Sequence, residues 1–203
     1  MSFLDNTKTA GTALWIVGIL MIISALLSIV CGFVDDDMKD HSVGYAIMGI
    51  GALICAFVYF GFGKSIRSGN LSDKFGIVTK FVYVVGLVTV ITGIFTAISG
   101  VGFDDIATYI VSGIIIVILG LIVMWIYRKI TDDSITTFDR VMWIILLVIF
   151  IILFILTVAS IFTVSGSGLE LAVNVINAIC DFVIYLFMIA FLLNSDVKAK
   201  FGM

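Results

Sequence analysis

The sequence contains no proline, one histidine and three cysteines, and only 12% of its 203 residues are charged. So few charges cannot build the polar shell that a soluble domain of this length needs. Without proline, the proline-broken helices that form many transport sites are not encoded. The single histidine, His41, excludes H-E-x-x-H zinc sites and haem sites with axial histidines inside a membrane. Cys31, Cys55 and Cys180 lie in apolar runs, which indicates small buried side chains rather than a disulfide framework.

Apolar residues, in contrast, make up 62% of the chain, and the mean hydropathy is +1.29. Apolar runs of about 20 residues recur, long enough to cross a bilayer as helices, whereas the short alternating segments of a β-barrel are missing. The sequence therefore predicts an all-α integral membrane protein, with residues 1–203 as a single transmembrane domain. Its six transmembrane helices are expected at residues 12–33, 43–62, 77–98, 106–127, 141–164 and 169–193.

The connections between the spans alternate between acidic and basic segments. Placing the basic segments on one side gathers ten of the eleven Lys and Arg residues there and leaves only Lys39 opposite. The excess of Lys and Arg in short cytoplasmic loops predicts that both termini are cytoplasmic, in an integral protein of the cell membrane. The three tryptophans, Trp15, Trp125 and Trp143, lie at the predicted inner ends of their spans, as interfacial indoles do.

Consecutive spans pair into three predicted hairpins. The outer segments 32–36 and 102–105 resemble one another, as do the inner segments 64–66 and 128–130. This indicates a weak threefold internal repeat with a unit of about 65 residues, although apolar sequence also matches itself by chance. Within one hairpin, Gly86 and Gly93, and likewise Gly113 and Gly120, recur at seven-residue spacing, which predicts close packing of the two helices.

The last span carries the only acidic residue deep inside an apolar run, Asp181. Together with it, four polar residues at helical spacing form one stripe about 80° wide: Glu170, Asn174, Asn177 and Tyr185. A carboxylate near the bilayer midplane costs roughly 3 kcal/mol, and no span carries Lys or Arg near that depth. The stripe is therefore expected to face protein or water and to bind or relay a proton or a cation. The structural alternative is a hydrogen-bonded contact between helices.

Other polar residues within the spans gather in the half nearest the acidic connections. They are Ser24, Ser28, Thr89, Thr92, Thr96, Thr108, Ser112, Thr157, Ser160 and Thr163. If their faces converge, they line a wet vestibule that ends at Asp181. Each hydroxyl has a structural alternative, because Ser and Thr in membrane helices commonly bond their own backbone or a neighbouring helix.

The first acidic connection offers a weaker candidate site for a divalent cation. It contains hard oxygen ligands and one imidazole, but matches no EF-hand spacing: Asp35, Asp36, Asp37, Asp40 and His41. An ordinary solvated acidic loop is the plainer interpretation.

Enzymatic functions are disfavoured by what the spans do not contain. Intramembrane aspartyl proteolysis needs two facing carboxylates, and only Asp181 qualifies. No phosphate-binding loop and no cofactor motif is present, and the small basic loops do not indicate nucleic-acid binding. Two hypotheses remain. One is a small carrier, channel or coupled transport component for a proton, cation or small solute. The other is a non-catalytic accessory or scaffold subunit that contacts partner membrane subunits or a second copy of itself.

Overall fold

The computed structural model describes residues 4, 6–34, 39–132, 135–163 and 168–203. All the regular structure in these ranges is helical, and six helices are long and apolar enough to cross a membrane. They are α1 (Thr7–Val34), α2 (Ser42–Arg67), α3 (Lys74–Ser99), α4 (Ile106–Ile130), α5 (Thr137–Thr163) and α6 (Gly168–Leu192). The predicted all-α architecture and six helices of membrane-spanning length and composition are confirmed in the described residues, while the predicted repeat and membrane orientation stay predictions.

Several helices extend beyond the apolar runs from which they were predicted, and in α3 a polar cap sets the earlier start. Asp73 precedes α3, and its side chain accepts a hydrogen bond of 2.8 Å from the backbone N–H of Gly76. The helix therefore begins at Lys74 rather than at residue 77. Asp105 caps α4 in the same way through the backbone N–H of Thr108. The predicted end of the fifth span, residue 164, lies outside the described residues.

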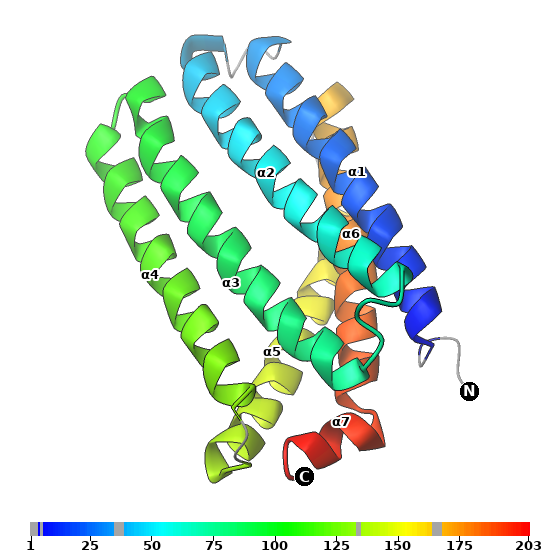
Figure 1. Ribbon diagram of the computed structural model, residues 1–203. Coiled ribbons are helices and arrows are strands. Elements are labelled where there is room, and N and C mark those ends of the chain that lie inside the picture. Colours follow the sequence, from blue (N-terminus) through cyan, green and yellow to red (C-terminus); the bar gives the residue numbers. More distant parts are fainter. Residues whose placement is uncertain (1–3, 5, 35–38, 133–134, 164–167) are drawn as a thin grey trace.

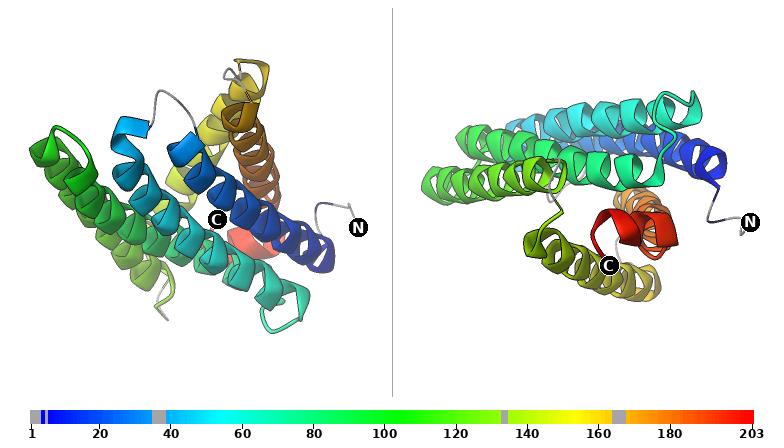
Figure 2. Two further views of the ribbon diagram at one scale, coloured as in Figure 1. Left: turned by 90° about the horizontal axis from the view of Figure 1, so that it is seen from above. Right: turned by 60° about the horizontal axis from the view of Figure 1, so that its bottom comes forward.

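Four of the long helices form a row, and the other two lie against one face of it (Figures 1 and 2). In the row, α1 packs on α2, α2 on α3, and α3 on α4. Helix α6 then packs on α1, and α5 packs on α6, whereas α4 and α5 barely touch. The six helices therefore almost enclose a central space that α2, α3, α4, α5 and α6 all border.

Glycines bring the paired helices of the row into close contact. A Cβ added at Gly93 would lie 2.7 Å from the backbone oxygen of Gly113 and 2.7 Å from the backbone nitrogen of Val117. The predicted glycine seam between α3 and α4 is confirmed. A second seam joins α1 to α2, where a Cβ at Gly63 would lie 2.5 Å from the backbone nitrogen of Trp15.

The short helix α7 (Ser195–Lys200) was not predicted from the sequence. It folds back under the bundle, where Phe201 packs against Phe75 of α3 with ring centroids 5.2 Å apart. The start of α1 and the C-terminus both lie toward this end of the bundle (Figure 1). We call it the basic end, since ten of the Lys and Arg residues are on the helix ends and connections there: Lys8, Lys64, Arg67, Lys74, Lys80, Arg128, Lys129, Arg140, Lys198 and Lys200. The opposite end, which carries Asp40, Asp104 and Asp105, is the acidic end.

Trp143 departs from the role expected of an interfacial indole. It is only 8% exposed, and its Nε1–H donates a 2.9 Å hydrogen bond to the backbone oxygen of Leu192. Trp143 therefore ties the start of α5 to the end of α6. Trp125, at 53% exposed, does lie on the surface near the basic end of α4.

Candidate functional site

Asp181 lies near the middle of α6 and lines a cavity of about 190 Å³ among five helices. Tyr59 of α2 and Tyr185 of α6 line the same cavity. Both tyrosines are close enough to interact electrostatically with the Asp181 carboxylate. Among the described residues, no Lys or Arg forms an ion pair with Asp181, and no group forms a hydrogen bond with it. The cavity therefore presents a carboxyl group that lacks a cationic partner in the described part of the chain.

A second cavity, of about 220 Å³, lies between α1, α2, α3 and α6 on the side of Asp181 nearer the acidic end. Its polar lining comes from Ser24, Ser28, Cys55, Thr92 and Asn177. The Ser24 hydroxyl donates a 2.7 Å hydrogen bond to the side-chain oxygen of Asn177. A cavity of this volume with several polar groups has room for water molecules and partners for them.

Tyr59 connects the two cavities, because its side chain lines both of them. Asn177 lies one helical turn before Asp181 on α6, so the second cavity continues the first toward the acidic end. We call the polar side chains that line the two cavities, Ser24, Asn177, Tyr59 and Asp181, the polar route; it runs from the half of the bundle nearer the acidic end to its middle.

Toward the basic end, the route meets a cluster of aromatic side chains. Phe81, only 1% exposed, lies at its centre. Its ring centroid is 5.9 Å from that of Phe62, 5.7 Å from that of Phe150 and 6.5 Å from that of Tyr59. Tyr185 stacks on Phe150 at 6.2 Å. Four of these rings, those of Tyr59, Phe81, Phe150 and Tyr185, form part of the wall of the Asp181 cavity.

The predicted stripe on α6 is only partly brought to this site. Asp181, Asn177 and Tyr185 line the two cavities. Asn174 is exposed and Glu170 lies in the first turn of α6, and neither is among the residues that line them. The stripe therefore continues along α6 beyond the reach of the cavities.

Several of the hydroxyl groups predicted to line a vestibule bond to their own helix instead. Thr89 donates to the backbone oxygen of Val85 at 2.8 Å, and Ser160 donates to that of Thr157 at 2.8 Å. Thr108 belongs to the cap of α4. These hydroxyl groups therefore form hydrogen bonds within or at the end of their own helix, as the structural alternative predicts. Ser24 and Thr92, in contrast, do line the second cavity.

Cys55 was treated in the sequence as a small buried apolar residue, but it also forms polar contacts. Its Sγ lies 3.7 Å from Thr92 Oγ1 and 3.7 Å from the backbone oxygen of Val88. The signal that could have found it is the spacing of Cys55 and Tyr59, which lie four residues apart and therefore share one face of α2.

The acidic connection gives little support to a cation site. Asp35, Asp36 and Asp37 lie outside the described residues. Of the two described candidates, Asp40 is exposed, and His41 faces the connection between α3 and α4. The Nδ1 atom of His41 is 3.3 Å from the backbone oxygen of Gly102, and its Nε2 atom is 3.8 Å from Asp104 Oδ2. His41 thus contacts the α3–α4 connection at the acidic end.

A buried carboxylate that the sequence did not single out, Asp139, lies at the basic end. It is 4% exposed, and its Oδ2 accepts hydrogen bonds from the backbone N–H and the hydroxyl of Thr136, at 2.6 and 2.8 Å. This arrangement closes the first turn of α5 as a capping box does. The other oxygen, Oδ1, has no partner among the described residues.

Comparison of the chain with family models, with curated proteins and with solved structures found no match. Its function is therefore inferred from the chemistry of the site. That site combines a carboxyl group without a described ion-pair or hydrogen-bond partner, two phenols and a polar route in the half of the bundle nearer the acidic end.

Proposed function

We propose that the protein is a small membrane transport component, a carrier or channel, that binds a proton or a cation at Asp181. The observation that carries the proposal is the Asp181 carboxyl group, which lines a cavity among five helices without a described basic partner. An ionisable residue at this depth is costly, and in membrane proteins it is commonly part of a substrate or ion pathway. A purely structural acid would be expected to have a hydrogen-bond donor or a cation from a neighbouring helix.

The polar route supplies access to this group. Ser24, Asn177 and Thr92 line its outer part and can hydrogen-bond water or the shell of a hydrated cation. The exposed Asp40, Asp104 and Asp105 at the acidic end create a negative potential that attracts cations. Aromatic side chains line the Asp181 cavity on the opposite side, and on this proposal they close it in a state that is accessible from the acidic end. Transport would then require a second state in which the Phe81 cluster moves.

A proton is the simplest ligand for this site. A bare metal cation typically needs six or more oxygen ligands, of which the cavity itself offers the two Asp181 carboxylate oxygens and the hydroxyls of Tyr59 and Tyr185. A proton needs only the carboxyl group. We therefore expect proton binding at Asp181, with a hydrated cation as the ligand that competes for the same carboxylate.

The orientation follows from the distribution of charge. We infer that the basic end faces the cytoplasm with both termini, because Lys and Arg in short connections are retained on that side. The polar route would then open to the outside of the cell membrane.

Flux measurements test this function. The purified protein is reconstituted into liposomes containing a pH-sensitive dye, and a pH step or an imposed potential drives proton movement. Asp181→Asn keeps the shape of the side chain but cannot bind a proton, and we expect it to abolish the flux. The matched control is Asp196→Asn, the same change at an exposed residue of α7, which should leave the flux unchanged.

Two results would overturn the proposal. One is the absence of proton and cation flux through the wild-type protein. The other is equal flux through wild type and Asp181→Asn, with both variants folded as judged by size-exclusion chromatography and helical circular dichroism.

The apolar outer faces of α4 and α5 favour a second candidate, a non-catalytic subunit of a larger membrane complex. Both helices expose most of their large apolar side chains, including Ile118, Leu121, Ile152 and Ile155. Partner helices, a second copy of the chain or lipid would all suit such faces. On this hypothesis the purified chain conducts nothing, and Asp181→Asn alters co-purification with partner subunits instead of flux.

A further inference from the structure

A third cavity, of about 280 Å³, lies between α2 and α3 near the basic end. It is separate from the polar route, with which its lining residues do not overlap. Four side chains with polar groups line it: Ser65 of α2, Asn70 of the α2–α3 connection, and Lys80 and Tyr83 of α3. The remainder of the wall is largely apolar, and Val58, Gly61 and Leu87 belong to that part.

The polar and apolar parts of this cleft follow one another along the bundle. On α2, Ser65 lies about one turn beyond Gly61 and two turns beyond Val58, nearer the basic end. On α3, Lys80 is nearer the basic end, while Leu87 lies about two turns deeper in the span. The cleft therefore changes from polar at the basic end to apolar toward the middle of the bundle. A phospholipid likewise changes from a polar headgroup to apolar acyl chains along its length.

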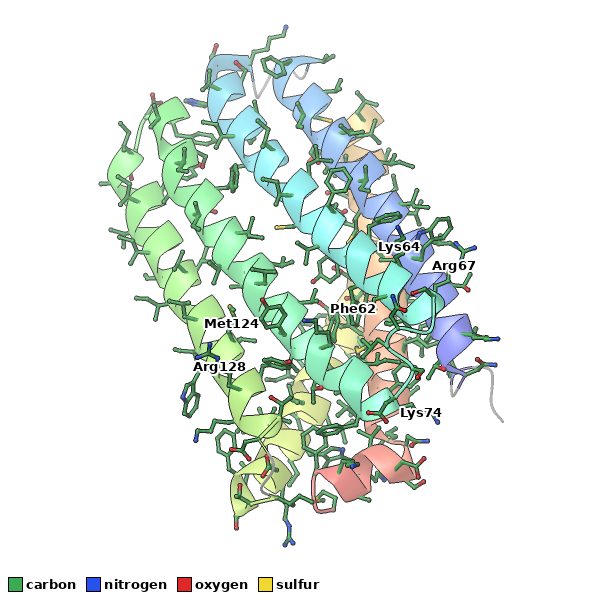
Figure 3. All side chains as sticks on the ribbon, in the orientation of Figure 1. Phe62, Lys64, Arg67, Lys74, Met124 and Arg128 are labelled. Atoms are coloured by element: carbon green, nitrogen blue, oxygen red, sulfur yellow. The ribbon has the colours of Figure 1, made fainter. Side chains whose placement is uncertain are left out.

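Lys80 supplies the charge in this cleft. Its Nζ atom lies 4.2 Å from the centroid of the Tyr83 ring, another lining residue, which holds the ammonium group beside the cavity. No described carboxylate forms an ion pair with Lys80. Arg67 and Lys74 lie at the same end of the bundle, as Figure 3 shows, and add to the positive potential there. The cleft therefore favours an anionic group.

Gly61 provides the space for an apolar chain. A Cβ added at this position would meet nothing within 4 Å. The glycine at position 63, in contrast, is in tight contact with α1, because a Cβ there would lie 2.5 Å from the Trp15 nitrogen. Helix packing therefore requires Gly63 but not Gly61, and the missing side chain of Gly61 leaves the wall of the cleft hollow.

We propose that this cleft binds one anionic phospholipid. The phosphate lies at Lys80, Asn70 and Ser65, and one acyl chain follows the wall formed by Val58, Gly61 and Leu87. Basic pockets between membrane helices are suited to anionic headgroups, and the hydrophobic contact adds to the electrostatic attraction. This site is independent of proton binding at Asp181.

Native mass spectrometry of the full-length protein in detergent tests the proposal directly. Phosphatidylglycerol and phosphatidylcholine of equal chain length are titrated separately, and inorganic phosphate is tested as a third ligand. We expect one phosphatidylglycerol to bind per chain, at least tenfold more tightly than phosphatidylcholine, because the quaternary ammonium of phosphatidylcholine cancels the net negative charge that Lys80 attracts, and a contact with a charged group contributes on this scale. Inorganic phosphate should neither bind at millimolar concentration nor displace the lipid, since it lacks the chain.

Three variants test the two halves of the site. Lys80→Gln removes the charge, and Gly61→Leu fills the apolar part without meeting another atom at its Cβ. Each should weaken phosphatidylglycerol binding at least tenfold. The matched control, Lys64→Gln, removes the same charge at the same end but outside the cleft, and should retain binding within about twofold because exposed charges contribute little.

Lys80→Arg keeps the positive charge and should bind phosphatidylglycerol as the wild type does. This variant shows whether Lys80→Gln weakens binding through the lost charge or through a disturbed fold. The proposal is overturned if Lys80→Gln and Gly61→Leu bind phosphatidylglycerol as the wild type does. It is equally overturned if phosphatidylcholine binds as tightly, or if Lys64→Gln loses as much affinity as Lys80→Gln. Displacement of the lipid by inorganic phosphate would reduce the cleft to an anion site without a chain pocket.

Discussion

Replacement of Gly93 by alanine is a stringent test of how α3 and α4 pack. The new Cβ would lie 2.7 Å from two backbone atoms of α4, the oxygen of Gly113 and the nitrogen of Val117. Ordinary contacts of a Cβ begin at 3.4 Å, and backbone atoms of a helix cannot rotate away as a side chain does. The two helices must therefore separate locally by roughly 0.7 Å, which is comparable to other overpacked cores.

The cost of this separation is about 2 kcal/mol, within the usual range for one inserted methyl group. For a chain of this length, such a loss lowers the melting temperature by about 4–8 °C. The assay is thermal unfolding of the detergent-solubilised protein, followed by circular dichroism. Gly61→Ala is the control, because its Cβ has nothing within 4 Å, and its melting temperature should not fall.

Combining Gly93→Ala with Gly113→Ala sharpens the test. A Cβ at Gly113 would lie 2.5 Å from the Gly93 oxygen, so both changes push the same pair of helices apart. The first methyl group already separates the helices. Adding Gly113→Ala to Gly93→Ala should therefore lower the stability by less than Gly113→Ala does in the wild type. A Gly93→Ala melting temperature within about 1 °C of wild type, or an equal fall for Gly61→Ala, would refute the close-packed seam.

Two further changes test the ends of the helices. Trp143→Phe removes the donor to the Leu192 oxygen and should cost about 1–2 kcal/mol, seen as a lower melting temperature, whereas Trp125→Phe at an exposed position should change it little. The hydrogen bonds from Thr108 lower the pKa of Asp105, so the stability contributed by its carboxylate is present above the unfolded pKa and is lost as the pH falls through the folded one. Asp105→Asn still caps α4 but does not titrate, so the melting temperature of the wild type should fall relative to this variant below about pH 4. A constant difference between the two proteins down to pH 2 would contradict this role of Asp105.

The six spans could be predicted from the sequence because a membrane helix satisfies its own backbone hydrogen bonds. Local hydropathy therefore identifies it without reference to any neighbour. The ends were less well predicted, since they depend on individual caps such as Asp73. Helix α7 was missed because six residues are too few to form a periodic pattern.

The glycine seams between paired helices were also predicted only in part from the sequence. The seven-residue spacing of Gly86 and Gly93 predicted a packing face, and α4 does lie there. Gly11 and Gly18 of α1 have the same spacing and pack against α2, so the signal for the second seam was equally present. Spacing identifies a face that can be approached closely. The spacing predicts the partner helix only where a short connection between two consecutive helices makes them neighbours.

The polar stripe on α6 illustrates what the sequence by itself determined: helical periodicity placed Asp181 and Asn177 on one face, and the lack of basic residues at that depth left the acid without a cation. Only the tertiary structure decided which groups meet that face. It brought Ser24 to Asn177 across 153 positions of sequence and placed Tyr59 beside the Asp181 cavity. The physical reason is that contacts between helices depend on crossing angles and on side-chain fit along both surfaces. Periodicity within a single helix contains neither of these quantities.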